Sequence, residues 1–181
     1  MLETDLDLIG KNMGWKESYE LGRKAELEFI AKLVLLWNVL EFRQPEGKFE
    51  EYDMEIKFRD CKTRFFEVKL DRLWVNSHMV WIEYEKKGKP TGICVTKADF
   101  VVYKLWDYFW CVNRSKLINL ILNSVSRIDC QWWDDWTVKL RVISEEEFYS
   151  IAKKVDEPNE NNDTSSTTVN NSVHNMAEVW V

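Results

Sequence analysis

The sequence Phe65-Phe66-Glu67-Val68-Lys69-Leu70-Asp71 combines the hydrophobic pattern of a β-strand with three charged side chains. Successive side chains of a strand point to opposite faces of the sheet. The charged residues are therefore expected on one face and the apolar residues on the other: Glu67, Lys69 and Asp71 against Phe66, Val68 and Leu70. This strand holds an acid and an ammonium side by side.

The length and composition favour a single folded domain followed by a polar tail. The chain has 181 residues, of which 45% are hydrophobic, with ten Trp and nine Phe. This is enough apolar material to bury one sizeable core, which we expect within residues 1–155. From Asp156 to about Asn175 nearly all residues are Asn, Ser, Thr, Asp or Glu. We expect 156–181 to be disordered, because too little apolar surface is present to offset the entropy of ordering.

The charge balance argues against nucleic-acid binding through general basicity. The net charge is −6, but without residues 151–181 the chain keeps 23 basic and 26 acidic side chains. Basic residues are also bunched, at 57–64 and at Lys86, Lys87 and Lys89. Local phosphate-binding patches therefore remain compatible with the composition.

Cysteine usage and hydropathy indicate a soluble protein of the cytoplasm, or of the host cytoplasm if the source is viral. The four Cys form no C-x-x-C pair and only two His are present, so we expect reduced thiols and no structural zinc. No apolar run approaches the roughly 20 residues of a membrane span, so we expect no membrane partner.

Hydrophobic spacing predicts alternating helical and strand segments. We expect an amphipathic helix over 17–38, followed by strands over 39–43, 49–58, 64–70 and 79–85. Further strands are predicted over 93–95, 100–105 and 108–112, then a helix over 117–122 capped by Ser115. A strand over 137–143 precedes a helix that begins with a capping box at Ser144 and ends near Lys154.

The acidic residues around the charged strand suit metal-assisted phosphodiester cleavage. Asp53 precedes Glu67 by thirteen intervening residues, and Lys69 follows. Mg²⁺ prefers hard oxygen ligands, polarises a phosphate and lowers the pKa of a bound water. Asp53 and Glu67 are candidate ligands, and Lys69 can orient or deprotonate the water or stabilise developing charge. The alternative is an ordinary charged strand face with cross-strand ion pairs.

This layout resembles the signature of the PD-(D/E)XK nuclease superfamily. The preceding Gly22-Arg23-Lys24-Ala25-Glu26 is similar to the helix that carries an acid in that superfamily. The resemblance implies an α/β fold with a restriction-endonuclease-like core, in which a central mixed β-sheet is flanked by helices. It also implies Mg²⁺ or Mn²⁺ bound by Asp53, Glu67 and the backbone carbonyl of Val68, with Lys69 and Glu26 completing the catalytic set. A surface ion pair with a residue three or four positions away is the alternative for Glu26.

A second resemblance follows in Met79–Glu85, Gly88-Lys89-Pro90-Thr91-Gly92-Ile93 and Thr96-Lys97-Ala98-Asp99-Phe100. These segments are similar to a branch of small phage and viral nucleases, a group that includes Holliday-junction-resolvase-like proteins. The resemblance implies Glu83 as an additional acid and a polar role for Asn76. Asp99 is equally compatible with a capping box.

Two departures from the superfamily pattern affect the choice of the first acid. Tyr52 stands where many members have Pro, and Asp60 is a rival acid closer to Glu67. We retain Asp53 because the proline position is widely variable. Lys86, Lys87 and Lys89 lie in a turn beside the expected site, where they would either contact phosphate or form a solvated basic turn.

The sequence therefore predicts a metal-dependent DNA endonuclease that acts in viral or phage recombination, repair or junction resolution. Many relatives act as dimers, so a homodimer is a further expectation. One alternative is a non-catalytic nucleic-acid-binding or assembly protein that keeps the fold. Another is an unrelated α/β interaction protein that uses the segment Trp132–Trp136 as its contact surface.

Overall fold

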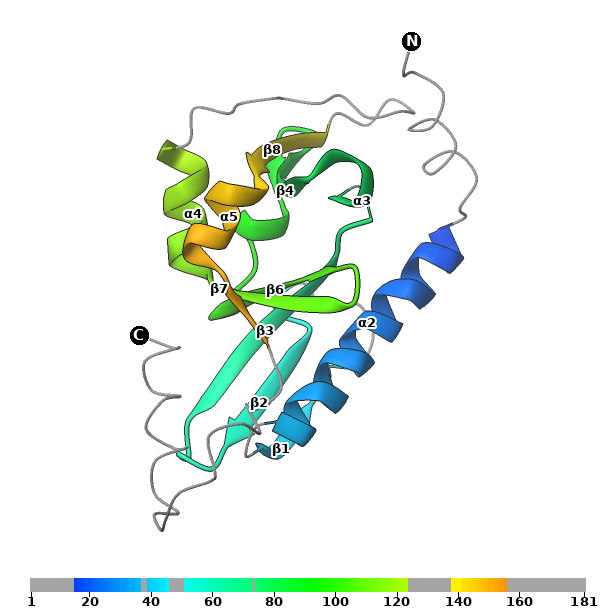
Figure 1. Ribbon diagram of the computed structural model, residues 1–181, viewed down its shortest axis with the longest axis vertical. Coiled ribbons are helices and arrows are strands. Elements are labelled where there is room, and N and C mark those ends of the chain that lie inside the picture. Colours follow the sequence, from blue (N-terminus) through cyan, green and yellow to red (C-terminus); the bar gives the residue numbers. More distant parts are fainter. Residues whose placement is uncertain (1–14, 37–38, 46–50, 73, 124–137, 156–181) are drawn as a thin grey trace, which may run out of the picture.

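The computed structural model describes residues 15–36, 39–45, 51–72, 74–123 and 138–155. The helix α2 (Trp15–Leu36) lies along one face of a six-stranded sheet (Figure 1). The helices α4 (Arg114–Asn123) and α5 (Glu145–Ile151) lie on the other side, together with a smaller sheet. The expected class, an α/β fold with a mixed sheet and flanking helices, is confirmed at this level.

The larger sheet has the strand order β1-β2-β3-β6-β7-β9. These strands are Val39–Arg43, Met54–Phe58, Thr63–Leu70, Phe100–Leu105, Tyr108–Asn113 and Lys153–Lys154. Only β3 and β6 are parallel within this sheet, with Glu67 opposite Val101 and Lys69 opposite Tyr103. The charged strand is therefore internal to the sheet and paired on both sides.

Two hydrophobic cores form because the sheet buries apolar side chains on both faces. Phe66 and Val68 of β3 and Phe100 and Val102 of β6 pack beneath α2. The intervening residues of β6, including Val101 and Tyr103, pack into a second core with α4, α5 and the smaller sheet. The charged face of β3 points toward this second side, because Glu67 and Lys69 alternate with the residues buried under α2.

The smaller sheet has the order β5-β4-β8. In the sequence, β4 and β5 lie between β3 and β6 of the larger sheet, and β8 lies between β7 and β9. Its strands are β4 (Met79–Lys86), β5 (Lys89–Pro90) and β8 (Val138–Ser144). The chain leaves β3, forms α3 (Trp74–Ser77), β4, β5 and the 3₁₀ helix η1 (Gly92–Cys94), and only then enters β6. The parallel pair β3–β6 thus requires this crossover.

Several local predictions need correction. Residues 93–95, expected as a strand, belong to η1 and its end: the Cys94 N–H donates to the Thr91 carbonyl at 3.0 Å, and the Val95 N–H donates to the Gly92 carbonyl at 3.1 Å. The helix expected from 117 begins earlier, so Ser115 lies inside it, and Asn113 accepts the backbone N–H groups of Ser115 and Lys116 instead. The last helix ends at Ile151, and β9 follows. The sequence did not predict α3, β5 or β9.

Other predictions are confirmed or fall outside the described residues. The Ser144 capping box is present, with the Ser144 hydroxyl and Glu147 bonded reciprocally. The segment Trp132–Trp136 and the polar tail 156–181 lie outside the described residues. No helix in the described ranges combines the length and apolar character needed to cross a membrane.

Gly92 is required by both its conformation and its surroundings, and Gly88 offers a matched control. A Cβ on Gly92 would lie 2.4 Å from the Glu83 carbonyl oxygen, whereas a Cβ on Gly88, at φ +73°, would meet no atom within 4 Å. We predict that Gly88→Ala costs about 1 to 2 kcal/mol through its positive φ alone. Gly92→Ala adds a backbone clash and should cost about 2 to 4 kcal/mol. Urea unfolding measures both, and equal losses would contradict the close packing of η1 on β4.

Candidate active site

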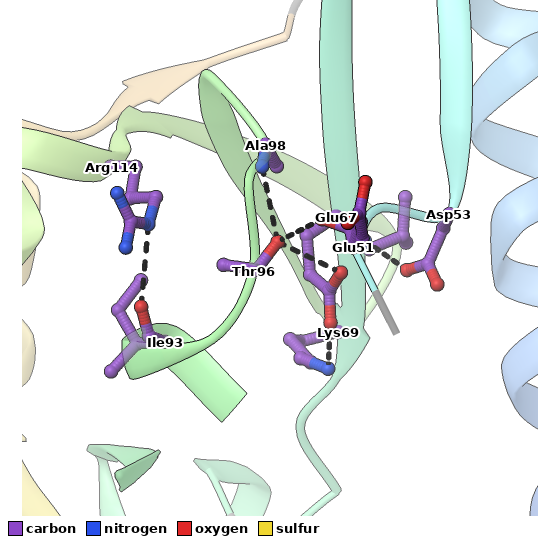
Figure 2. A network of polar contacts seen from close by, with 9 residues as sticks. Glu51, Asp53, Glu67, Lys69, Ile93, Thr96, Ala98 and Arg114 are labelled. Atoms are coloured by element: carbon purple, nitrogen blue, oxygen red, sulfur yellow. Dashed lines mark hydrogen bonds and ion pairs between the residues drawn. The ribbon is translucent and has the colours of Figure 1, made fainter. Parts of the chain in front are cut away.

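Glu67 and Lys69 form an ion pair on the face of β3 that points away from α2. The Lys69 ammonium contacts Glu67 Oε1. The Glu67 side chain is only 12% exposed, whereas that of Lys69 is 44% exposed. The acid is thus withdrawn into the protein while its cationic partner reaches solvent. Figure 2 shows the contact between the two side chains.

Asp53 is fixed against β3 by two hydrogen bonds. Its Oδ2 accepts the Val68 N–H at 2.7 Å, and its own backbone N–H donates to the Phe66 carbonyl at 2.9 Å. These bonds hold the residue that precedes β2 beside Glu67 (Figure 2). The rival Asp60 lies in the β2–β3 turn, 2.8 Å from Arg64. The structure therefore brings Asp53, and not Asp60, to Glu67. It leaves the role of the Val68 carbonyl a prediction.

Glu26 reaches the same cluster from α2 and is held in place by two side chains. Its Oε2 lies 2.5 Å from Arg23 and accepts from Gln44 at 3.1 Å. The Glu26 side chain is 12% exposed. The ion pair with a residue three positions away was the alternative interpretation, and it is present. The carboxylate is nevertheless largely withdrawn from solvent, and its pKa also responds to the charges of Glu67 and Lys69.

Burial and mutual repulsion perturb the acids of this cluster. Burial, and then the neighbouring Glu67 charge, raise the pKa of Asp53 from 3.8 to about 7. Burial also raises the pKa of Glu26, although Arg23 opposes the shift. For Lys69, loss of contact with water lowers the pKa, but the charges of the Glu67 and Asp53 carboxylates raise it by more. The net effect is a raised pKa. At neutral pH the lysine is therefore a cation, and it lies near an Asp53 carboxyl whose pKa is about 7.

Thr96 is a member of the cluster whose contact with Glu67 the sequence did not reveal. Its side chain is 2% exposed, and its hydroxyl lies 3.3 Å from Glu67 Oε2 and 2.8 Å from the Glu51 carbonyl (Figure 2). The hydroxyl also accepts the Ala98 N–H at 3.2 Å. The only available signal was the resemblance of Thr96–Asp99 to a nuclease motif. The long-range contact itself depends on tertiary structure.

Two further acids near this strand have structural partners. Asp71 is buried, and its carboxylate accepts the backbone N–H groups of Trp74 and Trp81, both at 3.1 Å. Asp71 therefore fixes the turn from β3 into α3 and β4. The Asp99 carboxylate accepts the Phe65 N–H at 2.9 Å, which joins the start of β6 to β3.

The residues expected to bind substrate are only partly placed. Glu83 lies on β4, and its charge contributes to the raised pKa of Lys69, so it belongs to the electrostatic environment of the site. Lys86, Lys87 and Lys89 are exposed at the β4–β5 turn. Asn76 lies in α3, but its side chain is outside the described part of the chain.

The donor set suits a hard divalent cation in its chemistry. Asp53 and Glu67 supply carboxylate oxygens, and their mutual repulsion is the condition that a bound cation relieves. Within the described ranges, no group of three or more His, Cys, Asp or Glu side chains is arranged to hold a metal. The fit therefore rests on these two acids, and the backbone carbonyl of Val68 is a third ligand that the family resemblance implies.

Comparisons of the chain with protein-family models, with curated proteins and with solved structures find no match.

The raised pKa of Asp53 predicts how stability depends on pH. Because the folded protein binds this proton more tightly than the unfolded chain does, the carboxyl destabilises the fold increasingly as the pH rises from about 4 to 7. Asp53→Asn removes the charge and keeps an oxygen acceptor for the Val68 N–H. We expect the variant to gain about 1 to 3 kcal/mol of unfolding free energy at pH 8 and little at pH 4.

Thermal melts at both pH values measure this effect, and a protein of this size shifts by about 2 to 4 °C per kcal/mol. Asp60→Asn is the matched control, since Arg64 lowers the pKa of Asp60 through a side-chain hydrogen bond. The control should lose stability above pH 5 rather than gain it. A gain for Asp53→Asn that is the same at both pH values would rule out the electrostatic explanation.

Proposed function

We propose that this chain is a metal-dependent DNA endonuclease of the PD-(D/E)XK nuclease superfamily, with a restriction-endonuclease-like core. The observation that carries the proposal is the fixing of Asp53 onto β3 beside the Glu67–Lys69 pair. Thirteen residues separate the two acids in the sequence. The hydrogen bond from the Val68 N–H to Asp53 holds Asp53 against the strand residue that follows Glu67. The mixed sheet with α2 on one face agrees with the fold that the resemblance implies.

In this proposal, Asp53 and Glu67 bind Mg²⁺ or Mn²⁺ together with the Val68 carbonyl. The bound ion would polarise the scissile phosphate and lower the pKa of the attacking water. Glu67 is oriented for this task by two neighbours, the Thr96 hydroxyl and the Lys69 ammonium. Asp53 is oriented by the Val68 N–H. The two acids are therefore positioned before any substrate binds.

Lys69 acts in this mechanism as a cation. Its pKa is raised by two carboxylates, so at neutral pH the ammonium donates hydrogen bonds and stabilises the negative charge that develops on the phosphate. A role as general base would require the opposite shift. Glu26, which is held by Arg23 and Gln44, acts through the charges of Glu67 and Lys69 and is a positioning residue.

The biological setting follows from the second resemblance. The likeness of residues 79–100 to small phage and viral nucleases supports a role in recombination, repair or junction resolution, in the host cytoplasm if the source is viral. A homodimer that cuts two strands is supported by exposed apolar side chains near the edge strand β1. Leu35 is 83% exposed, and Leu40 and Phe42 are about half exposed. Light scattering that shows a monomer at high concentration would argue against the dimer.

The second candidate is a non-catalytic nucleic-acid-binding or assembly protein. The observation in its favour is that each charge of the cluster already has a partner in the fold, such as Lys69 for Glu67 and Arg23 for Glu26. A charged strand with a purely structural role has the same appearance. The two functions differ in whether the acids bind a divalent metal.

Cleavage of supercoiled plasmid and of a four-way junction, with Mg²⁺, Mn²⁺ or EDTA, tests the proposal. We expect cutting only with metal, and a loss of at least about 100-fold in Glu67→Gln and in Lys69→Met. The matched controls are Glu55→Gln, on the same sheet face one strand away, and Lys153→Met on β9. Both should cut like the wild type. Circular dichroism checks that every variant is folded.

The outcome that contradicts the enzyme is also defined. If no substrate is cut and calorimetry detects no Mn²⁺ binding that depends on Asp53 and Glu67, the chain is the binding protein. If cutting persists in Glu67→Gln and Lys69→Met, the nuclease site lies elsewhere.

A further inference from the structure

A pocket of about 260 Å³ lies between α2, the end of β3 and the turn that joins β6 to β7. Its lining at β3 begins with Leu70, which packs against the core beneath α2, so the pocket lies on the α2 side of the strand that carries Glu67 and Lys69. Its lining combines apolar and charged side chains: Leu21, Lys24, Ala25, Leu70, Asp71, Arg72, Lys104 and Trp106.

Positive charge predominates in this lining, although the whole chain has a net charge of −6. Lys24, Arg72 and Lys104 contribute three cations, and Asp71 is the one acid. Both carboxylate oxygens of Asp71 accept backbone N–H groups, which spread part of its charge. Lys104 forms a close ion pair with Glu28. Lys24 lies 3.9 Å from the same acid, and its side chain is 71% exposed. The lining therefore suits an anionic ligand, with Lys24 accessible for contact.

Trp106 is placed where the fold itself offers little reason for a tryptophan. It is 58% exposed and has φ +57° at the first position of a two-residue hairpin turn. Such turns favour Gly, Asn or Asp there, and a bulky side chain at positive φ is strained. Its ring meets Trp74 edge to face at 6.4 Å, which leaves much of the indole accessible. Strain that persists without burial is typical of functional positions.

We propose that this pocket binds one nucleotide of a single-stranded or locally unpaired nucleic-acid strand, with the base stacked on Trp106 and the phosphate held by Lys24 and Arg72. An exposed indole next to cations is the combination that binds single strands without sequence preference. In a duplex both faces of each base are covered by neighbouring bases, so the indole can stack only on an unpaired base. The inference rests on the proposed nuclease function and assigns its substrate class: nucleic-acid strands that contain an unpaired nucleotide.

Fluorescence anisotropy of a labelled 15-nucleotide single strand tests the pocket, with the full chain in EDTA so that no cleavage occurs. Trp106→Ala should weaken binding roughly fivefold to a hundredfold. Trp106→Phe keeps an aromatic face and should restore most of the affinity. Tyr19→Ala, at a similarly exposed aromatic residue on α2 that does not line the pocket, is the control and should bind like the wild type. A blunt duplex of the same sequence should show no dependence on Trp106.

The role of Lys24 is tested against a cation on the same helix. Lys24→Gln should reduce the slope of log Kd against log salt by about 0.7, the value expected for one lost phosphate contact on a single strand. Lys16→Gln makes the same charge change two turns away on α2. An equal change in both variants would mean that only the general charge of the helix matters, and would overturn the assignment of the pocket.

A comparison of Trp106→Gly with Trp106→Ala separates the ring from the backbone. Both lack the indole, so both should bind equally weakly, but glycine tolerates positive φ and should melt at a higher temperature than alanine. Wild-type affinity in Trp106→Ala, or a dependence on Trp106 for duplex alone, would overturn the proposal. Because these measurements use EDTA, they are independent of cleavage. If Trp106→Ala binds weakly but the wild type cuts no substrate, the proposed nuclease function is refuted and the proposed binding pocket is still supported.

Discussion

The two-residue alternation of β3 is the constraint on which the rest of this structure depends. Phe66 and Val68 are buried beneath α2, so Glu67 and Lys69 must point to the opposite face. A slip of one residue in the pairing with β2 or β6 would exchange the two sets and place both charges in the core. The same strand register therefore determines both the packing of α2 and the position of the charged cluster.

That arrangement places electrostatic stress within the fold. Three acids approach one lysine in a partly buried site, and the acid with the least compensation, Asp53, has its pKa raised to about 7. A chain selected for stability alone would not retain this cluster, since an uncharged hydrogen-bonding side chain would serve the fold as well. Arg23 and Gln44 relieve the stress only at Glu26. The remaining repulsion is what a bound cation would remove.

Local pattern was sufficient to predict the elements whose signals are contained in one segment. The α2 periodicity, the alternation of β3 and the Ser144 capping box all appear in the structure. The preference for Asp53 over Asp60 also agrees with the geometry. The failures share a physical origin. A short apolar run such as 93–95 does not distinguish strand from helix, and the close approach of Gly92 to the Glu83 backbone is not visible in the sequence. The contact of Thr96 with Glu67 and the pairing of β9 arise only when distant segments meet.

The parallel pairing of β3 with β6 and the late position of β8 make both sheets depend on segments that are far apart in the sequence. Residues 138–155 supply β8, which completes the smaller sheet beside β4, and β9, which covers the outer edge of β7. Until this segment has been synthesised, both sheets have an open edge, and α5 is absent from the second core. During synthesis the strands that carry the acids therefore exist before the segment that stabilises their surroundings. The full set of contacts around the larger and smaller sheets therefore depends on pairings of long sequence separation.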